Sequence, residues 1–191
     1  ALPIWLNRYL AESELLKSIV ESGYEISDSD FAALSKLMYD EDGIIKAVEL
    51  APNGVVRSVY PKASNADVLG LNMLRHPERK VEASLAKESG QYTIAGPFQL
   101  VQGGTGALLF DPIYTTGADG SQKYWGFSVL VLDWKSFLDE IQINKLQDAS
   151  YEYLIWKEGH NGERIVIAQG DRPVGPNTLE VACAVPNDTW Y

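Results

Sequence analysis

Helical and alternating patterns of hydrophobic residues follow one another along this chain and predict a mixed α and β fold. Apolar positions recur at helical spacing over residues 3–22, with a proline in the first turn and Gly23 at the end, which predicts a long amphipathic helix. Ser27 and Asp30 form a capping-box pattern before a second helix over 29–39. Its predicted buried side consists of Phe31, Leu34, Leu37 and Met38.

Stretches rich in β-branched, aromatic and aliphatic residues predict strands over 44–50, 55–60, 92–101, 107–115 and 123–132. The glycine-rich segment 102–106 supplies positive-φ positions, so the third and fourth strands form a hairpin. A helix over 77–89, with Val81 and Leu85 four apart on one side, should cover one face of the sheet. This order of elements predicts an α+β fold with a five-stranded antiparallel, PAS-like sheet and flanking helices.

The end of the chain predicts a smaller β-rich, PAS-like part. A helix over 134–145 leads to strands at 151–156, 163–169 and 178–185. We therefore divide the chain into an N-terminal helical segment, a domain built on the large sheet and a smaller C-terminal part. Their predicted limits are 1–42, 43–133 and 134–191.

The fourth strand of the large sheet has two apolar faces. Leu108, Phe110 and Pro112 share one face, and Leu109 and Asp111 point to the other. Both faces should therefore be covered. If Asp111 is buried it needs a partner, and Arg75 or Arg79 is the expected one.

Composition narrows the classes of partner. The chain has 191 residues, enough for one domain or one domain with a small satellite, and its net charge is −10. Nucleic acid and anionic membrane surfaces would repel such a chain, and no basic patch offsets this. The single cysteine, Cys183, excludes an internal disulfide. The chain begins at Ala1 and has no apolar run of 18 residues, so we expect a piece of a longer protein.

Enzymatic motifs are missing from the sequence. His76 and His160 stand alone, without paired cysteines or the HExxH spacing of a zinc site. The G-x-S-x-G elbow of serine hydrolases does not occur. We predict a protein that is not an enzyme and holds no metal and no cofactor.

A set of short motifs, in a characteristic order, resembles the CHASE domain. The first is Val68-Leu69-Gly70-Leu71-Asn72 with Arg75 and Arg79, and a helix ending at Gly90 follows. The rest of the set is 95–100, the glycine turn, 109–114 and Trp125-Gly126-Phe127. The resemblance spans about residues 44–135. CHASE domains are extracytoplasmic sensor regions of plant cytokinin receptors and of many bacterial kinases and nucleotide cyclases.

The resemblance implies an organisation for the whole protein. The domain would be a loop on the outer side of the cytoplasmic membrane, between transmembrane helices. Residues 43–133 would be its membrane-distal ligand-binding domain, and 134–191 its membrane-proximal part. It would signal to a histidine kinase or to a diguanylate cyclase that makes cyclic di-GMP. The helix over 3–22 would then be a stalk and a homodimer seam. From the residues alone, a helix packed on its own core explains the pattern equally well.

The resemblance also implies a small-molecule pocket. Asn72 stands where plant receptors carry an aspartate that binds adenine, and an amide both donates and accepts hydrogen bonds. Ala95 and Phe110 replace small threonines, so we expect a partly polar metabolite other than a cytokinin. The predicted ligand-binding residues are Asn72, Tyr60, Arg75, Gln99, Val101, Leu109, Asp111 and Trp125. The alternative is a non-catalytic protein-interaction module with a filled core and an exposed apolar patch.

Overall fold

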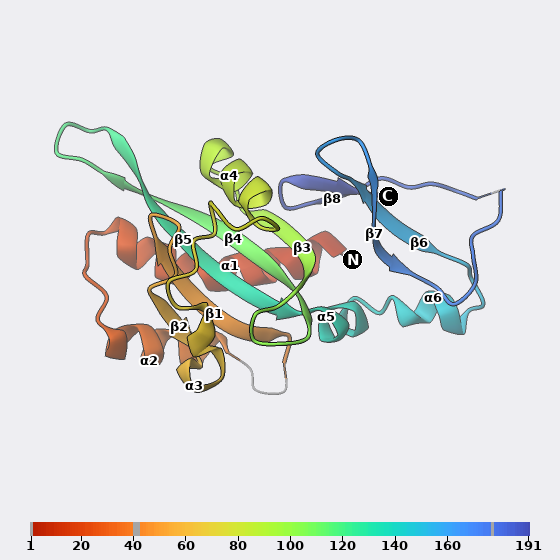
Figure 1. Cartoon of the computed structure of the whole chain (residues 1–191), viewed down its shortest axis with the longest axis horizontal. Coiled ribbons are helices and arrows are strands. Elements are labelled where there is room, and N and C mark those ends of the chain that lie inside the picture. Colours follow the sequence, from red (N-terminus) through yellow and green to blue (C-terminus); the bar gives the residue numbers. More distant parts are fainter. Residues whose placement is uncertain (1, 40–42, 177) are drawn as a thin grey trace.

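The computed structural model describes residues 2–39, 43–176 and 178–191 of the chain. Two antiparallel sheets lie beside each other along the long axis of the molecule (Figure 1). The five-stranded sheet has the order β2-β1-β5-β4-β3, and the four-stranded sheet has the order β7-β6-β9-β8. The strands of the large sheet are β1 (Ile45–Pro52), β2 (Ser58–Tyr60), β3 (Thr93–Gln99), β4 (Thr105–Thr116) and β5 (Gln122–Asp133). The α+β fold with a second, smaller sheet is as predicted.

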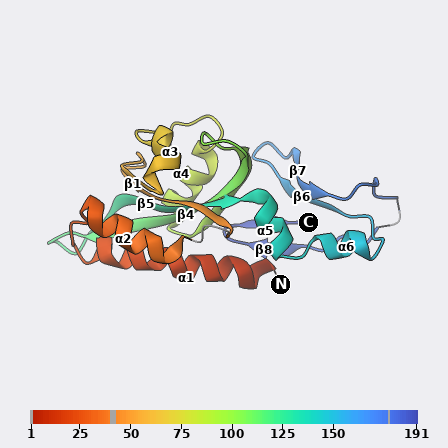
Figure 2. The same ribbon diagram turned by 90° about the horizontal axis from the view of Figure 1, so that it is seen from below.

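Helices cover both faces of the large sheet (Figure 2). On one face lie α1 (Leu2–Glu21) and α2 (Asp28–Met38), and on the other lie α3 (Lys62–Asn65) and α4 (Lys80–Ser89). We call these the α1 face and the α4 face. A 3₁₀ helix, η1 (Ala66–Val68), follows α3, while α5 (Trp134–Glu140) and α6 (Asn144–Asp148) lead toward the small sheet. Within the described ranges, no helix has the length and apolar character needed to cross a membrane.

The second helix begins as its sequence predicts. The Ser27 side chain accepts a hydrogen bond from the Asp30 amide, and the Asp30 carboxylate accepts one from the Ser27 amide. The prediction for Leu37 is wrong, since that side chain is 78% exposed. The buried stripe of α2 consists of Phe31, Ser35 and Met38. Leu37 lies off this stripe, because successive residues of a helix are separated by about 100°.

The hairpin of β3 and β4 is confirmed. Gly103 and Gly104 adopt φ of 91° and 78° in its turn, where a side chain would be strained. Beyond the turn, Gln99 pairs with Thr105. Along β4 the side chains alternate as predicted, so that Leu109 packs in the core of the α1 face and Phe110 in the core of the α4 face. Both faces are covered.

Helix α4 covers its face of the sheet with different residues from those expected. Ala83 and Ala86 are fully buried, whereas Val81 and Leu85 remain 42% and 41% exposed. The small alanine side chains let the helix backbone lie close to the strands, and this turns the larger aliphatic side chains toward solvent. The helix ends at Gly90, whose φ of 69° is the left-handed conformation of a C-terminal cap.

The small sheet departs from the prediction in its last strands. It consists of β6 (Leu154–Glu158), β7 (Arg164–Gln169), β8 (Cys183–Val185) and β9 (Asp188–Trp190). The single strand predicted over 178–185 is wrong: only its last three residues pair, in a hairpin with β9. Asn187, with φ of 56°, turns that hairpin.

Two further predictions concern the connections. The helix predicted over 134–145 is divided into α5 and α6, because Gln142 between them has a φ of 60° that no α-helix accommodates. The predicted limit between residues 42 and 43 falls at the edge of the described residues, since 40–42 lie outside them. The division into three parts stays a prediction.

Contacts across the molecule join α4 and β3 to the small sheet. Lys157 Nζ on β6 lies 3.1 Å from Glu82 of α4 and 3.5 Å from Asp188 of β9. The Asn187 side chain donates hydrogen bonds to Ser89 and Thr93. Lys157 is almost fully buried, so these ion pairs are shielded from solvent and from salt.

Candidate functional site

Each face of the large sheet buries one acidic side chain of a strand. On the α1 face this is Asp111, which is fully buried on β4. Ser13 Oγ donates to its Oδ2 at 2.8 Å, and Lys17 Nζ donates to its Oδ1 at 2.9 Å. Burial raises the pKa of Asp111, while the hydrogen bonds and charge of Lys17 act in the opposite direction.

The predicted pairing of Asp111 with Arg75 or Arg79 is therefore wrong. Alternation along β4 turns Asp111 toward α1, where Lys17 and Ser13 lie. The two arginines belong to the segment that covers the opposite face. The acid has the partner that burial requires, but the partner comes from a different element.

On the α4 face the buried acid is Glu49, in the middle of β1. It lies in a cross-strand row with Val129 of β5 and, one strand further, Phe110 of β4. Its side chain is 1% exposed, and Ala47 and Ala51 flank it on the same face. Burial raises the pKa of Glu49 from 4.5 to about 7, and the positive charge of Arg79 opposes this shift.

Arg79 is the residue directly before α4, and its side chain is 2% exposed. Burial lowers the pKa of its guanidinium, and the nearby Glu49 carboxyl raises it. Within the described ranges, Glu49 Oε2 and Arg79 Nε have no hydrogen-bond partner. Leaving such groups unpaired in the interior typically costs about 1–3 kcal/mol each. The α4 face thus holds two groups of opposite charge, each with one polar atom that lacks a hydrogen bond in the described part of the chain.

The surroundings of these charges are apolar. Met73, Phe110 and Phe127 are fully buried on this face, and the rings of Phe110 and Phe127 lie 5.2 Å apart. In such a medium a charged group interacts more strongly with a partner than it does in water. Hydrogen bonds formed by Glu49 and Arg79 would therefore be stronger here than at the surface.

Segment 53–79 covers the pair and is tied to itself by backbone hydrogen bonds. The Val56 amide donates to Leu71 at 3.0 Å, and the Met73 amide donates to Gly54 at 2.8 Å. Asn72 forms an isolated β-bridge with Val55. The Asn72 side-chain oxygen accepts the Leu74 amide at 3.0 Å, so that oxygen stabilises the local turn.

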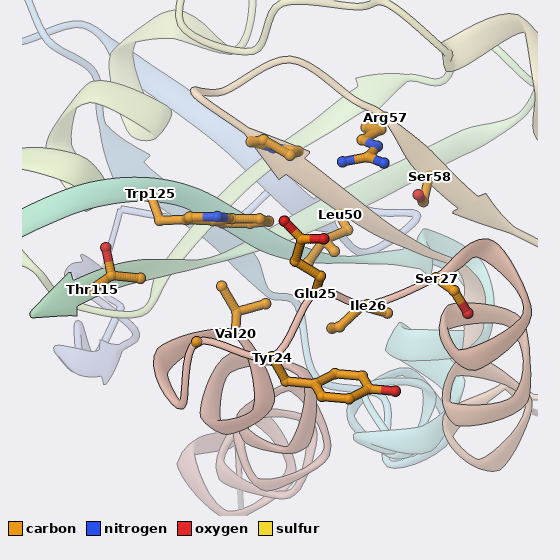
Figure 3. A pocket seen from close by; sticks show the side chains of 12 residues that line it. Val20, Tyr24, Glu25, Ile26, Ser27, Leu50, Arg57, Ser58, Thr115 and Trp125 are labelled. Atoms are coloured by element: carbon orange, nitrogen blue, oxygen red, sulfur yellow. The ribbon is translucent and has the colours of Figure 1, made fainter.

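An open groove lies on the α1 face, where α1 ends and the chain crosses to α2 (Figure 3). Its volume is about 500 Å³, within the range of small-molecule sites. Leu50 and Val20 form apolar parts of its wall, and Trp125 presents its indole ring to it. The charged side chains of Glu25 and Arg57 also line it.

The sequence of this chain matches a known domain family. The profile of the CHASE domain matches residues 25–167, about three quarters of the chain. The chain belongs to the CHASE domain family. It is therefore an extracellular sensor domain. A search of the curated proteins finds no match.

A solved structure with a similar fold is an extracellular ligand binding receptor from Desulfohalobium retbaense DSM5692. The sequences are 18% identical, and the TM-score is 0.57. The match covers 85% of this chain and 27% of the receptor chain. This chain thus spans about a quarter of the length of that receptor, and the likeness concerns the fold.

The structure does not bring the predicted ligand-binding residues of this CHASE domain into one cavity. Asn72 belongs to the cover of the α4 face, whereas Asp111 and Leu109 point to the α1 face. Tyr60 is half-buried and meets Tyr39 edge to face at 5.6 Å.

The remaining predicted residues lie nearer the surface. Arg75, Gln99 and Val101 are exposed, and Gln99 donates a hydrogen bond to Thr105 on the neighbouring strand. Trp125 lines the groove of the α1 face. The structure therefore distributes the eight residues over both faces and the outer surface.

Sequence reasoning missed Glu49 altogether, and it considered Arg79 as part of a motif and as a possible partner of Asp111. A signal was present for Glu49, because a single acid stands inside the apolar run of β1. The alternation of β1 places it on the same face as Ala47 and Ala51, so a buried acid could have been inferred. No sequence pattern shows that residue 79 lies above it.

In the part of the chain that the structure describes, no three histidine, cysteine, aspartate or glutamate side chains gather as metal ligands would. Each buried acid of the large sheet has a cation nearby: Asp111 is paired with Lys17, and Glu49 lies near Arg79. Such pairs suit the recognition of a small molecule or the stabilisation of the core.

Proposed function

We propose that this CHASE domain senses a small, partly polar metabolite on the α4 face of its large sheet. The observation that carries the proposal is the buried pair of Glu49 and Arg79, whose Oε2 and Nε have no partner among the described residues. A ligand with a hydrogen-bond donor and an acceptor would satisfy both groups. The energy of those bonds would offset the cost of moving segment 53–79.

The protonation behaviour of Glu49 suits such a ligand. With a pKa of about 7, the carboxyl exists in both forms near neutrality. The neutral form donates a hydrogen bond, whereas the carboxylate only accepts. Arg79 supplies donors alone, so the pair can meet a ligand of mixed polarity. Asn72, in the cover of the same face, stays in the proposal as a ligand contact through its amide nitrogen.

Cytokinin is not the proposed ligand. Phe110 is fully buried on the α4 face against Phe127 and lies in the cross-strand row of Glu49, on the far side of Val129. A planar purine would have to displace this aromatic pair. A compact metabolite needs less rearrangement, which favours the class of small amino acids and carboxylates.

Signal transmission requires that the ligand bind one arrangement of the domain better than another. Each tenfold preference would bias the output by about 1.4 kcal/mol. The proposed whole protein has flanking transmembrane helices and a cytoplasmic histidine kinase or diguanylate cyclase. It would function as a homodimer through α1, on which Leu15 is 41% exposed.

The test is a ligand screen on the purified domain. Native mass spectrometry would detect a retained metabolite, and thermal shifts would be recorded with adenine derivatives, amino acids and carboxylates. A stabilising compound should lose its effect in Glu49→Gln and in Arg79→Lys. Asp111→Asn, a change in the buried acid of the opposite face, is the matched control and should respond like the wild type.

Two results would count against this site. One is a ligand that stabilises Glu49→Gln and the wild type equally. The other is a broad screen without any stabilising compound and without a retained molecule.

A protein-interaction module remains the second candidate function, and exposed apolar side chains favour it. Val81 and Leu85 stand four residues apart on the outer side of α4, so they are neighbours on the helix surface. If the output depended on a protein partner at this surface, Val81→Ser with Leu85→Ser would abolish the response of the intact receptor. The small-molecule proposal expects that double variant to retain its thermal response to ligand.

A further inference from the structure

The groove on the α1 face has the composition of a binding site that is separate from the Glu49 and Arg79 pair. Its apolar part includes Leu50, which is 5% exposed, and Val20, which is 4% exposed. Both pack in the core of the α1 face, so the wall is a rigid part of the fold. The sheet therefore separates this groove from the α4 face.

Trp125 gives the groove a flat aromatic surface. Figure 3 shows its indole edge-on, with Val20 and Tyr24 on one side of the ring plane. The backbone fixes its position, because the Trp125 carbonyl accepts the Asn53 amide at 2.7 Å. The next residue, Gly126, approaches so closely that an added Cβ would lie 2.2 Å from the Ala51 carbonyl oxygen. The backbone of Trp125 is thus held firmly, and its partly buried ring packs against the core of the α1 face. Such a ring loses little freedom when it stacks on a planar ligand.

Opposite charges stand at the same groove. Glu25 comes from the loop between α1 and α2, and Arg57 comes from the segment between β1 and β2. Neither forms a salt bridge with another described residue, and both side chains lie beside the groove in Figure 3. An ammonium group matches the first and a carboxylate matches the second, which a guanidinium can bind through two parallel hydrogen bonds.

We infer that this groove is a second ligand site, which binds an aromatic α-amino acid. The side-chain ring would stack on Trp125, the carboxylate would meet Arg57, and the ammonium would meet Glu25. The Ser58 hydroxyl at the same groove offers a further hydrogen bond. The site is distinct from the proposed function, because Trp125, Val20 and Leu50 belong to the α1 face. Arg57 and Ser58 come from segment 53–79, so that segment contributes to both sites.

Isothermal titration calorimetry with L-phenylalanine tests this inference. The wild type should bind, and Arg57→Gln and Glu25→Gln should each weaken binding about tenfold, because each removes one charge-assisted contact at a partly solvated site. Arg75→Gln changes another exposed arginine and should leave the affinity unchanged. Trp125→Leu, which keeps an apolar side chain but removes the stacking surface, should also weaken binding about tenfold.

Ligand analogues identify which group meets which charge. Phenylpropionate lacks the ammonium, so its affinity should no longer depend on Glu25, and phenethylamine lacks the carboxylate, so its affinity should no longer depend on Arg57. Glu49→Gln should leave L-phenylalanine binding intact. Binding that is lost in Glu49→Gln and retained in Arg57→Gln would place the amino acid on the α4 face and overturn the inference. The absence of any binding heat would overturn it as well.

Discussion

The two faces of the large sheet each bury an acidic side chain, but the two acids differ in their hydrogen bonding. Asp111 on the α1 face receives hydrogen bonds from Ser13 and Lys17 at 2.8 and 2.9 Å. Glu49 on the α4 face lies near Arg79, yet its Oε2 has no partner among the described residues. On the α1 face both carboxylate oxygens of the buried acid are hydrogen-bonded. On the α4 face one oxygen of the buried acid is left without a hydrogen bond in the described part of the chain.

This difference indicates which face of the sheet is the less stable one in the absence of a ligand. A buried carboxylate that is fully hydrogen-bonded holds its neighbours in one arrangement. A buried acid with a pKa of about 7 and an unsatisfied oxygen makes the folded state less stable until something binds it. The α4 face is therefore the side of the sheet on which occupancy can change stability most.

The largest effect on the difference between the two faces is expected when the positive charge on the α4 face is removed. Arg79→Met leaves Glu49 buried without a cation, so the free energy of unfolding at pH 8 should fall by about 3–5 kcal/mol, as measured by urea denaturation. Arg75→Met is the exposed control and should change it by less than about 0.5 kcal/mol.

Adding Glu49→Gln to Arg79→Met should recover part of the lost stability, because the double variant no longer buries an unpaired charge. Equal stability of Arg79→Met and Arg75→Met would contradict the view that the two buried groups interact.

A second test is to vary pH. The pKa of Glu49 is raised from 4.5 to about 7 in the folded state, so between these values the folded protein holds a proton that the unfolded chain has lost. The contribution of Glu49 is therefore most favourable below pH 4.5 and decreases as pH rises to 7, by about 3 kcal/mol in total. Chemical denaturation across this range should show the decrease in the wild type and a flatter profile in Glu49→Gln. Identical profiles would show that another group titrates.

The smallest expected effect is on the α1 face. Ser13→Ala removes one of the two hydrogen bonds to Asp111 while Lys17 remains, so stability should fall by about 1 kcal/mol. Ser18→Ala, at an exposed position of the same helix, is the matched control and should have almost no effect. If both serines behave alike, the hydrogen bond to Asp111 contributes nothing measurable.

Much of the fold could be predicted because local pattern determines it. The strands of the large sheet alternate or form apolar runs, and the glycine turn at 102–106 fixes the hairpin of β3 and β4. The capping box at Ser27 and Asp30 was likewise read from two residues. Features of this kind depend on neighbours in sequence.

The errors concern which element lies over which face. Alternation correctly placed Asp111 opposite Phe110, but it could not show that α1 supplies Lys17. Similarly, the larger residues Val81 and Leu85 were expected to face the sheet, whereas close packing selected Ala83 and Ala86. Long-range neighbours follow from tertiary packing, which a single sequence does not reveal.

Helix α4 acts as a strut between the two sheets. Arg79 precedes its first residue, Glu82 in its first turn is bound by Lys157, and Ser89 at its last residue accepts from Asn187. The helix is thereby fastened at both ends, and the hairpin of β8 and β9 must follow any tilt that begins above Glu49. A displacement at the buried pair would therefore be carried to β9.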